Sequence, residues 1–258
     1  MLNKYLSLAV CFSLVTPAYS FNQDSDYFYP PTVNGVALEY GIGKLSIRDE
    51  YISKEKYSGK IPYFSVTWSQ TDNSDGYALG LHHRHSSDIM NYNMRADITE
   101  FSLFFDKFHR NNRILKSFPK LLTYLGPSLE FYTIFFDQKV AGNGLNASFS
   151  FFSMFSLAAN SMHYYHIADK LWVVGGVRVS LVSVGLRMVD FTGSDEEPLG
   201  ILHPLSALKV TTNVGLLYEV SENISARFVY KFQFLRLQEW DPILSASDNV
   251  TVDLKYNF

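Results

Sequence analysis

The sequence contains one cysteine, Cys11, among its 258 residues, and this scarcity excludes one class of secreted protein. A secreted eukaryotic domain usually carries several disulfides, which this chain cannot form. The near-absence of cysteine suits a bacterial envelope protein, because such a protein passes through an oxidising compartment. We therefore expect an exported bacterial protein.

Other features are also missing, and each absence argues against a function. No apolar run approaches the roughly 20 residues that a transmembrane helix needs. The net charge of −3 is too small and of the wrong sign for a nucleic-acid-binding protein. No glycine-rich phosphate loop, Cys-x-x-Cys pair or carboxylate dyad is visible, so we expect neither a cofactor nor a metal site.

The first twenty residues have the organisation of a secretory signal peptide. Lys4 supplies a positive charge, residues 6–15 form an apolar segment, and residues 18–20 place small side chains at the −3 and −1 positions of a cleavage site. We expect cleavage directly after residue 20. Residues 21–33 contain two adjacent prolines, which resist strand pairing, and they are predicted to form a short periplasmic lead-in. A single domain would then span residues 34–258.

The most informative feature that is present is a strict alternation of apolar and polar residues. It is clearest in the last segment, NVTVDLKYNF, whose apolar members are Val250, Val252, Leu254, Tyr256 and Phe258. Alternation with a period of two indicates a strand with one apolar and one polar face. The pattern recurs over residues 36–42, 64–68, 210–220 and 224–234. Segments of about ten alternating residues separated by turns are typical of transmembrane β-barrels.

The alternating segments predict an all-β fold, a transmembrane antiparallel up-and-down β-barrel of about ten strands. The expected strands are 34–53, 61–71, 76–87, 96–109, 121–138, 146–163, 170–190, 205–221, 223–239 and 248–258. The connections TDNSDG, HIADK and SEN at one end are short, whereas KEKYSGK, DIMNYNMR, FTGSDEEPLGILHP and DPILSASD at the other are longer. The long basic connection RNNRILKSFPK breaks this pattern, and additional strands there would raise the number to twelve.

A signal peptide, alternating strands and a terminal aromatic residue together resemble a Gram-negative outer-membrane β-barrel protein. The resemblance implies a location in the bacterial outer membrane, surrounded by lipopolysaccharide or phospholipid. It also implies that Tyr256 and Phe258 form a membrane-insertion signal that the barrel-assembly machinery recognises. These implications concern compartment and fold, because a shared fold does not establish an activity.

In a barrel that faces lipid with its apolar residues, the polar residues of each strand face the lumen. The predicted lumen network consists of Glu39, Arg84, Glu130, Arg178, Arg227 and Lys231. Lys44, Arg48, Glu219, Asp253 and Lys255 are further candidates for the lumen. About ten strands enclose little space. A plug of paired side chains and a narrow pore for small solutes both fit this set, so we expect a structural or narrow-pore protein.

The segment YALGLHHRHSSD could carry chemistry. If Tyr77, Leu79 and Leu81 face lipid, the same parity places His85 and Ser87 outward, and an imidazole next to a hydroxyl can activate it as a nucleophile. The segment resembles the His-x-Ser strand of the lipid A deacylase and outer-membrane phospholipase A families. That resemblance implies catalytic residues Ser87 and His85, with Glu100 on the next strand as the orienting carboxylate.

The sequence departs from those families, which commonly continue with Asn and Gly where Asp88 follows the serine here. The alternative function is therefore an outer-leaflet lipid hydrolase that acts on acyl esters of lipid A or phospholipid. Two further interpretations stay open. The histidines could be ordinary interfacial side chains, or His83 and His85 could bind a metal, although only Glu100 is near enough to be a third ligand.

The insertion signal leads to a first prediction. Deleting Phe258 should leave little folded barrel in the outer membrane, because the last aromatic side chain of the recognised strand is lost. The measurement is the amount of protein in outer-membrane fractions that migrates faster on a denaturing gel when unheated than when boiled. A yield equal to that of the intact chain would contradict the predicted role of Phe258.

Overall fold

The structure is a computed structural model that describes residues 34–71, 74–91, 94–111, 118, 120–140, 146–189 and 199–258. The predicted signal peptide and lead-in, residues 1–33, lie outside the described residues. Within the described residues, no helix is long and apolar enough to cross a lipid bilayer.

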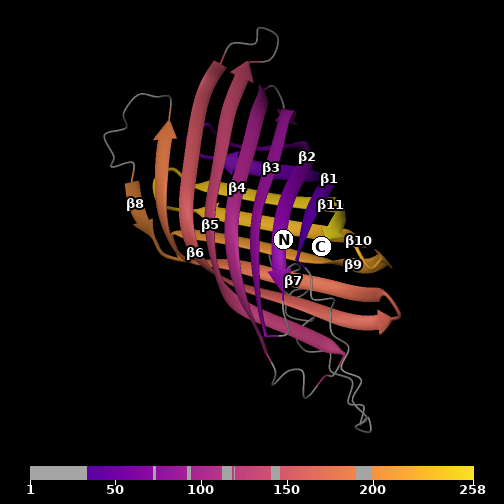
Figure 1. The fold of residues 1–258 in the computed structure, drawn as a ribbon. Helices are drawn as coiled ribbons and strands as arrows, with labels where there is room; N and C mark the ends of the chain where they lie inside the picture. Colours follow the sequence, from indigo (N-terminus) through magenta and orange to yellow (C-terminus); the bar gives the residue numbers. More distant parts are fainter. Residues whose placement is uncertain are drawn as a thin grey trace.

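The described residues form strands throughout, and the strands pair antiparallel with their neighbours (Figure 1). Their bounds are β1 Gly35–Asp49, β2 Ser53–Thr71, β3 Asp75–Met90, β4 Met94–Arg110, β5 Leu121–Val140, β6 Asn146–Ala168, β7 Leu171–Val189, β8 Leu199–Leu202, β9 Ala207–Ser221, β10 Ile224–Leu237 and β11 Ile243–Asn257. Pairing of β1 with β11 closes the wall into a barrel. Ten strand positions surround the lumen, which confirms the predicted fold.

The short strand β8 shares a wall position with β9. β8 pairs with the part of β7 around Ser183–Leu186, and β9 pairs with the part from Leu171 to Val179. A turn over residues 204–206 separates the two strands. β8 therefore lies within the predicted loop FTGSDEEPLGILHP, beside the predicted strand 205–221, and the number of wall positions stays at ten. The basic segment 112–117, where extra strands were considered, lies outside the described residues.

The strands tilt strongly around the barrel. From Leu38, the pairing through β2, β3, β4 and β5 reaches β6 at Phe155. In the other direction, through β11, β10, β9 and β7, it reaches β6 at Ala168, the far end of that strand. A stagger of this kind requires strands that run obliquely to the barrel axis.

Two predicted loops are strands in the structure. KEKYSGK lies inside β2, and most of DPILSASD lies inside β11, so these connections shrink to residues 50–52 and 238–242. The reason is visible in β2, where Tyr57 and Ile61 are buried in the lumen while Lys56 and Lys60 are exposed. The apolar residues face inward there. Because charged residues face outward over this part of β2, its sequence resembled that of a polar loop.

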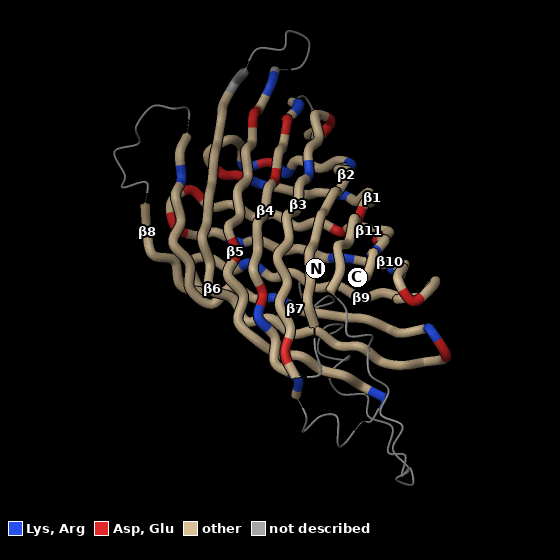
Figure 2. Tube along the Cα trace, in the orientation of Figure 1, with Lys and Arg blue, Asp and Glu red and all other residues tan. Residues whose placement is uncertain are grey.

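The lumen is filled in layers. At the end far from the termini, an apolar cluster packs across the barrel; it includes Leu45, Ile61, Ile98, Phe136, Phe152 and Leu235. A smaller apolar cluster around Phe104, Tyr124 and Trp172 lies toward the other end. Charged side chains occupy the level between the two clusters. Along β6, the chain trace has no Lys, Arg, Asp or Glu residue, whereas single charged positions interrupt the neighbouring strands (Figure 2).

Candidate functional site

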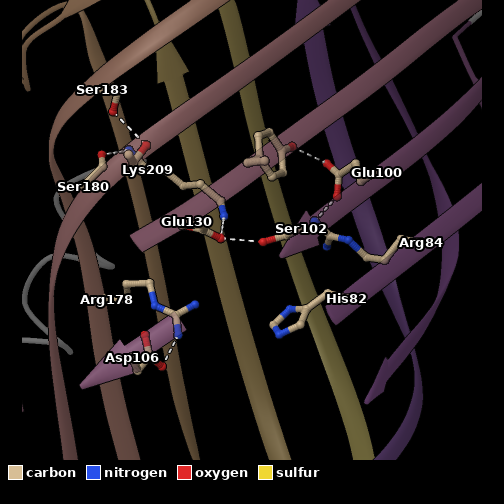
Figure 3. Close-up of polar contacts among 12 residues, drawn as sticks. His82, Arg84, Glu100, Ser102, Asp106, Glu130, Arg178, Ser180, Ser183 and Lys209 are labelled. Carbon is tan, nitrogen blue, oxygen red and sulfur yellow. Dashed lines mark hydrogen bonds and ion pairs between the residues drawn. The ribbon is translucent and has the colours of Figure 1, made fainter. Parts of the chain in front are cut away.

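The charged side chains between the two apolar clusters are the chemically distinctive part of the barrel. They come from β3, β4, β5, β7 and β9 and point into the same interior space (Figure 3). Strand parity explains the convergence, since every second residue of each strand faces the lumen. Each charge is buried, and a buried charge requires a partner.

Arg84 and Glu100 form the first ion pair. They are directly opposite each other on β3 and β4, and their side chains are 5% and 3% exposed. The Tyr132 hydroxyl donates to Glu100 Oε1 at 2.9 Å. Arg84 Nη1 donates to the Ser247 hydroxyl on β11. These contacts therefore bridge the lumen from β3–β5 to the closing strand.

Lys209 and Glu130 form a second pair, with side chains 3% and 4% exposed. The Ser102 hydroxyl donates to Glu130 Oε1 at 2.6 Å. The Lys209 ammonium also lies 4.4 Å from the centroid of the Tyr132 ring. Because Tyr132 touches Glu100 through its hydroxyl and Lys209 through its ring, it couples the two ion pairs into one cluster.

A third group lies around Tyr63. The Lys231 ammonium donates to Glu39 Oε2 at 2.6 Å and to the Tyr63 hydroxyl at 3.1 Å. An ammonium can only donate, so the Tyr63 hydroxyl accepts there and can give its own proton to His82 Nδ1 at 3.0 Å. The Thr251 hydroxyl donates to the other Glu39 oxygen at 2.6 Å. The hydrogen-bonded chain crosses from β11 to β3.

Three further pairs complete the interior. Arg178 donates to Asp106 at 2.6 Å, Arg227 donates to Asp253 at 2.6 Å, and Arg187 donates to Asp49 at 2.7 Å. The six residues predicted to form the lumen network, Glu39, Arg84, Glu130, Arg178, Arg227 and Lys231, all lie inside, and each takes part in an ion pair. Glu219 is also hydrogen-bonded, since it accepts from Trp172 Nε1 at 3.0 Å.

The sequence-based placement of Lys44 and Arg48 in the lumen is wrong. Both are exposed, because the neighbouring Leu45 and Ile47 take the inward positions. The prediction assumed that polar residues face inward along the whole strand, and the apolar cluster reverses this rule. Asp49 was missed for the same reason, although its even spacing from Glu39 places it on the inward face.

Lys209, Asp106 and Arg187 were not predicted either. Lys209 and Arg187 face inward on β9 and β7 and are 3% and 5% exposed. Their alternation with outward Leu208 and Met188 is a signal that parity could have used. Their partners come from strands distant in the sequence, so no spacing rule could have identified the pairs.

The predicted catalytic set does not assemble. Glu100 lies inside the barrel, while His85 is exposed on the outer face, where its Nδ1 is 2.9 Å from the Thr99 hydroxyl. The register pairs His85 with Thr99 and Arg84 with Glu100, so Thr99 shares the outer face with the histidine. Ile98, two residues before Glu100 on the same face of β4, is fully buried in the interior apolar cluster.

Ser87 lies at an irregularity in the wall, since the pairing of β3 with β4 shifts register between Ser86 and Ile89. Arg95 binds this segment by donating to the Ser87 carbonyl and, at 2.6 Å, to the Asp88 carboxylate. These contacts give the bulge a structural explanation. Within the described ranges, no three His, Cys, Asp or Glu side chains are grouped to hold a metal ion.

The space left within the ionic cluster is small. A cavity bounded by Tyr63, His82, Arg84, Glu100 and Tyr132 has a volume of about 10 Å³. A single water molecule needs about that much space. This cavity is therefore large enough for one water molecule at most.

No family model and no curated protein matches the chain. Solved structures of similar fold are outer-membrane β-barrels. Neisserial surface protein A has a TM-score of 0.39 at 10% identity and covers 86% of this chain and 97% of its own. The Escherichia coli outer membrane protease OmpT has a TM-score of 0.48 at 11% identity, covering 91% and 100%. The translocator domain of the Neisseria meningitidis autotransporter NalP has a TM-score of 0.46 at 11% identity, covering 100% and 95%. These similarities concern the fold and say nothing about activity.

The buried pairs lead to a second prediction. Replacing Glu130 with Ala leaves the Lys209 ammonium buried without its partner, which should lower the free energy of unfolding by about 3–5 kcal/mol. Adding Lys209→Met to the same chain should restore part of that loss, because the unpaired charge is removed. The measurement is urea-induced unfolding of the barrel refolded in lipid vesicles.

The matched control is Asp88→Asn, which breaks the ion pair with Arg95. The side chains of Arg95 and Asp88 are 49% and 76% exposed. An exposed pair contributes only about 0–1 kcal/mol. Equal losses from the buried and the exposed substitution would contradict a structural role of the interior cluster.

Proposed function

We propose that the protein is an integral β-barrel of a Gram-negative outer membrane, with a structural role and a lumen closed by its own side chains. The observation that carries this proposal is the outer face of the wall. On β1 alone, Leu38, Tyr40 and Ile42 are 55%, 66% and 55% exposed. A soluble protein rarely exposes a continuous apolar band, whereas lipid stabilises one.

The apolar band continues around the barrel. Exposed members on other strands include Phe64, Leu103, Phe131, Phe155, Val184, Leu216, Phe228 and Val252. The closed pairing of the wall supports the same conclusion, because lipid cannot satisfy the unpaired backbone groups of an open sheet. A charged interior with an apolar exterior is the reverse of the usual soluble arrangement.

The filled lumen favours the structural role over the narrow pore. Ions would have to cross an apolar cluster that contains Ile61, Phe136 and Phe152 and then a level at which the charges are already paired. The hydrolase alternative loses its main support, since Glu100 and His85 lie on opposite sides of the wall.

The surrounding lipid and the barrel-assembly machinery are the partners that this proposal implies. The last residue supports a role for the C-terminal strand in closure. The Phe258 backbone N–H donates to the Asn34 carbonyl at 2.9 Å, so the terminal aromatic residue lies at the seam between β1 and β11. Recognition of this strand during assembly remains part of the proposal.

The proposed location leads to a third prediction, which uses the absence of cysteine after residue 20. A Lys54→Cys variant carries its thiol on β2, near the β1–β2 turn, and a Glu222→Cys variant carries it in the turn between β9 and β10, at the opposite end. In intact cells, a membrane-impermeant maleimide should label the first variant and reach the second only after the outer membrane is permeabilised. Identical labelling of both variants in intact cells would contradict an outer-membrane location with the β1–β2 turn outside the cell and the β9–β10 turn in the periplasm.

The closed lumen leads to a fourth prediction. The purified barrel, reconstituted in a planar lipid bilayer, should give no stable single-channel steps, because the interior charges are paired and the apolar cluster excludes water. An open porin prepared in the same detergent is the positive control. Reproducible steps from the native chain would favour the narrow-pore interpretation instead.

A further inference from the structure

A groove crosses the outer wall just beyond the apolar residues of β1. Its volume is about 720 Å³, within the usual range of small-molecule sites. The groove spans β2, β1, β11 and β10, and the exposed side chains that line it are Ile42, Lys44, Lys60, Tyr230, Asp248 and Val250. It therefore opens toward the surroundings of the barrel.

Two lysines face each other across this groove. The register pairs Lys44 of β1 directly with Lys60 of β2, and both side chains are exposed. Like charges directly opposite each other on one face of a sheet destabilise it. In the described part of the chain, no carboxylate lies within ion-pair distance of either ammonium. The pair thus presents two positive charges at one point, and neither ammonium forms an ion pair with a described residue.

Asp248 is the one acidic residue in the groove. It is opposite Lys44 in the register, and its carboxylate accepts the Lys44 backbone N–H at 3.3 Å. It therefore offsets one charge and leaves the groove with a net charge of +1, counted over Lys44, Lys60 and Asp248. The groove retains a preference for an anion.

The lumen provides the contrast. Arg84, Arg178, Arg187, Lys209 and Lys231 each contact a carboxylate within the barrel. These inward cations are neutralised within the barrel, whereas no carboxylate of the described ranges contacts the ammonium groups of the outward pair. A partner outside the barrel can supply the missing negative charge.

The apolar neighbours of the lysines indicate what kind of anion fits. Ile42, two residues before Lys44 on β1, is paired with Val250 of β11. Tyr230 of β10 is opposite Val250. These side chains are 55%, 44% and 44% exposed. A ligand with a charged group at the lysines and acyl chains along the apolar residues would satisfy both halves of the groove.

We propose that this groove binds the phosphate of an outer-leaflet lipid between Lys44 and Lys60, with the acyl chains lying along Ile42, Val250 and Tyr230. The inference rests on the proposed membrane location, and it names the lipid class that the wall would select. Ammonium groups bind phosphate by charge-assisted hydrogen bonds. The ligand would be a phosphorylated lipid, since free phosphate uses only the polar half of the groove.

The test measures lipid bound to the detergent-purified, folded full-length barrel by native mass spectrometry. The probe is a bisphosphorylated lipid A, and the same lipid without its phosphates is the second arm. The Lys44→Ala/Lys60→Ala double variant should bind the phosphorylated lipid at least about tenfold more weakly than the native chain. Lys44→Arg/Lys60→Arg should retain the affinity, because both positive charges are kept.

The matched control is Lys107→Ala/Lys120→Ala, which removes the same charge near the β4–β5 connection at the opposite end of the barrel. It should leave the affinity unchanged. Excess inorganic phosphate tests whether the groove binds free phosphate instead of the phosphate of a lipid. It should not displace the lipid. Displacement by phosphate alone would overturn the assignment of a lipid site.

Two outcomes separate this inference from the proposed location. Equal affinity of the Lys44→Ala/Lys60→Ala variant and the native chain would overturn the lipid site, even if surface labelling at position 54 succeeded. Lysine-dependent lipid binding without surface labelling would support the groove and overturn the location. Gel mobility before and after heating verifies that each variant is folded.

Discussion

A wall that faces hydrocarbon must satisfy its backbone N–H and C=O groups within itself, and the pairing of β1 with β11 is where this chain meets that requirement. The two strands pair along their whole length, from Gly35 with Asn257 to Asp49 with Ile243. This pairing brings the two ends of the domain together and removes the open edges of the sheet. Closure then determines a second requirement, since the enclosed space must be filled.

The filling explains why the interior is both charged and apolar. Side chains from opposite parts of the wall meet across the lumen, and a charge placed there must find its partner on another strand. The Tyr132 ring and hydroxyl join the pairs Arg84–Glu100 and Lys209–Glu130 into one cluster. Beyond this level the interior is mainly apolar, with Arg187 and Asp49 as a buried ion pair, and Lys44 and Lys60 of the same wall face outward.

This change of polarity along the strands has consequences on both sides of the wall. Inside, Leu45, Ile61 and Ile98 pack together in the cluster that closes the lumen. Outside, Lys44 and Lys60 follow directly after the exposed apolar residues of the wall, such as Ile42. The groove proposed to bind a phosphorylated lipid is therefore the outer counterpart of the apolar cluster inside.

The sequence by itself determined the strands, their approximate number and the inward direction of Glu39, Arg84, Glu130 and Lys231, because alternation with a period of two is a local property. It could not determine where along each strand the polar face changes sides. That level depends on which side chains meet across the lumen, and on a stagger set by all ten wall positions. The misplacement of Glu100, Lys44 and the KEKYSGK segment has this single cause. Only the tertiary structure decided which charges pair across the lumen, since Lys209 and Glu130, like Arg187 and Asp49, lie on strands far apart in the sequence that closure brings near.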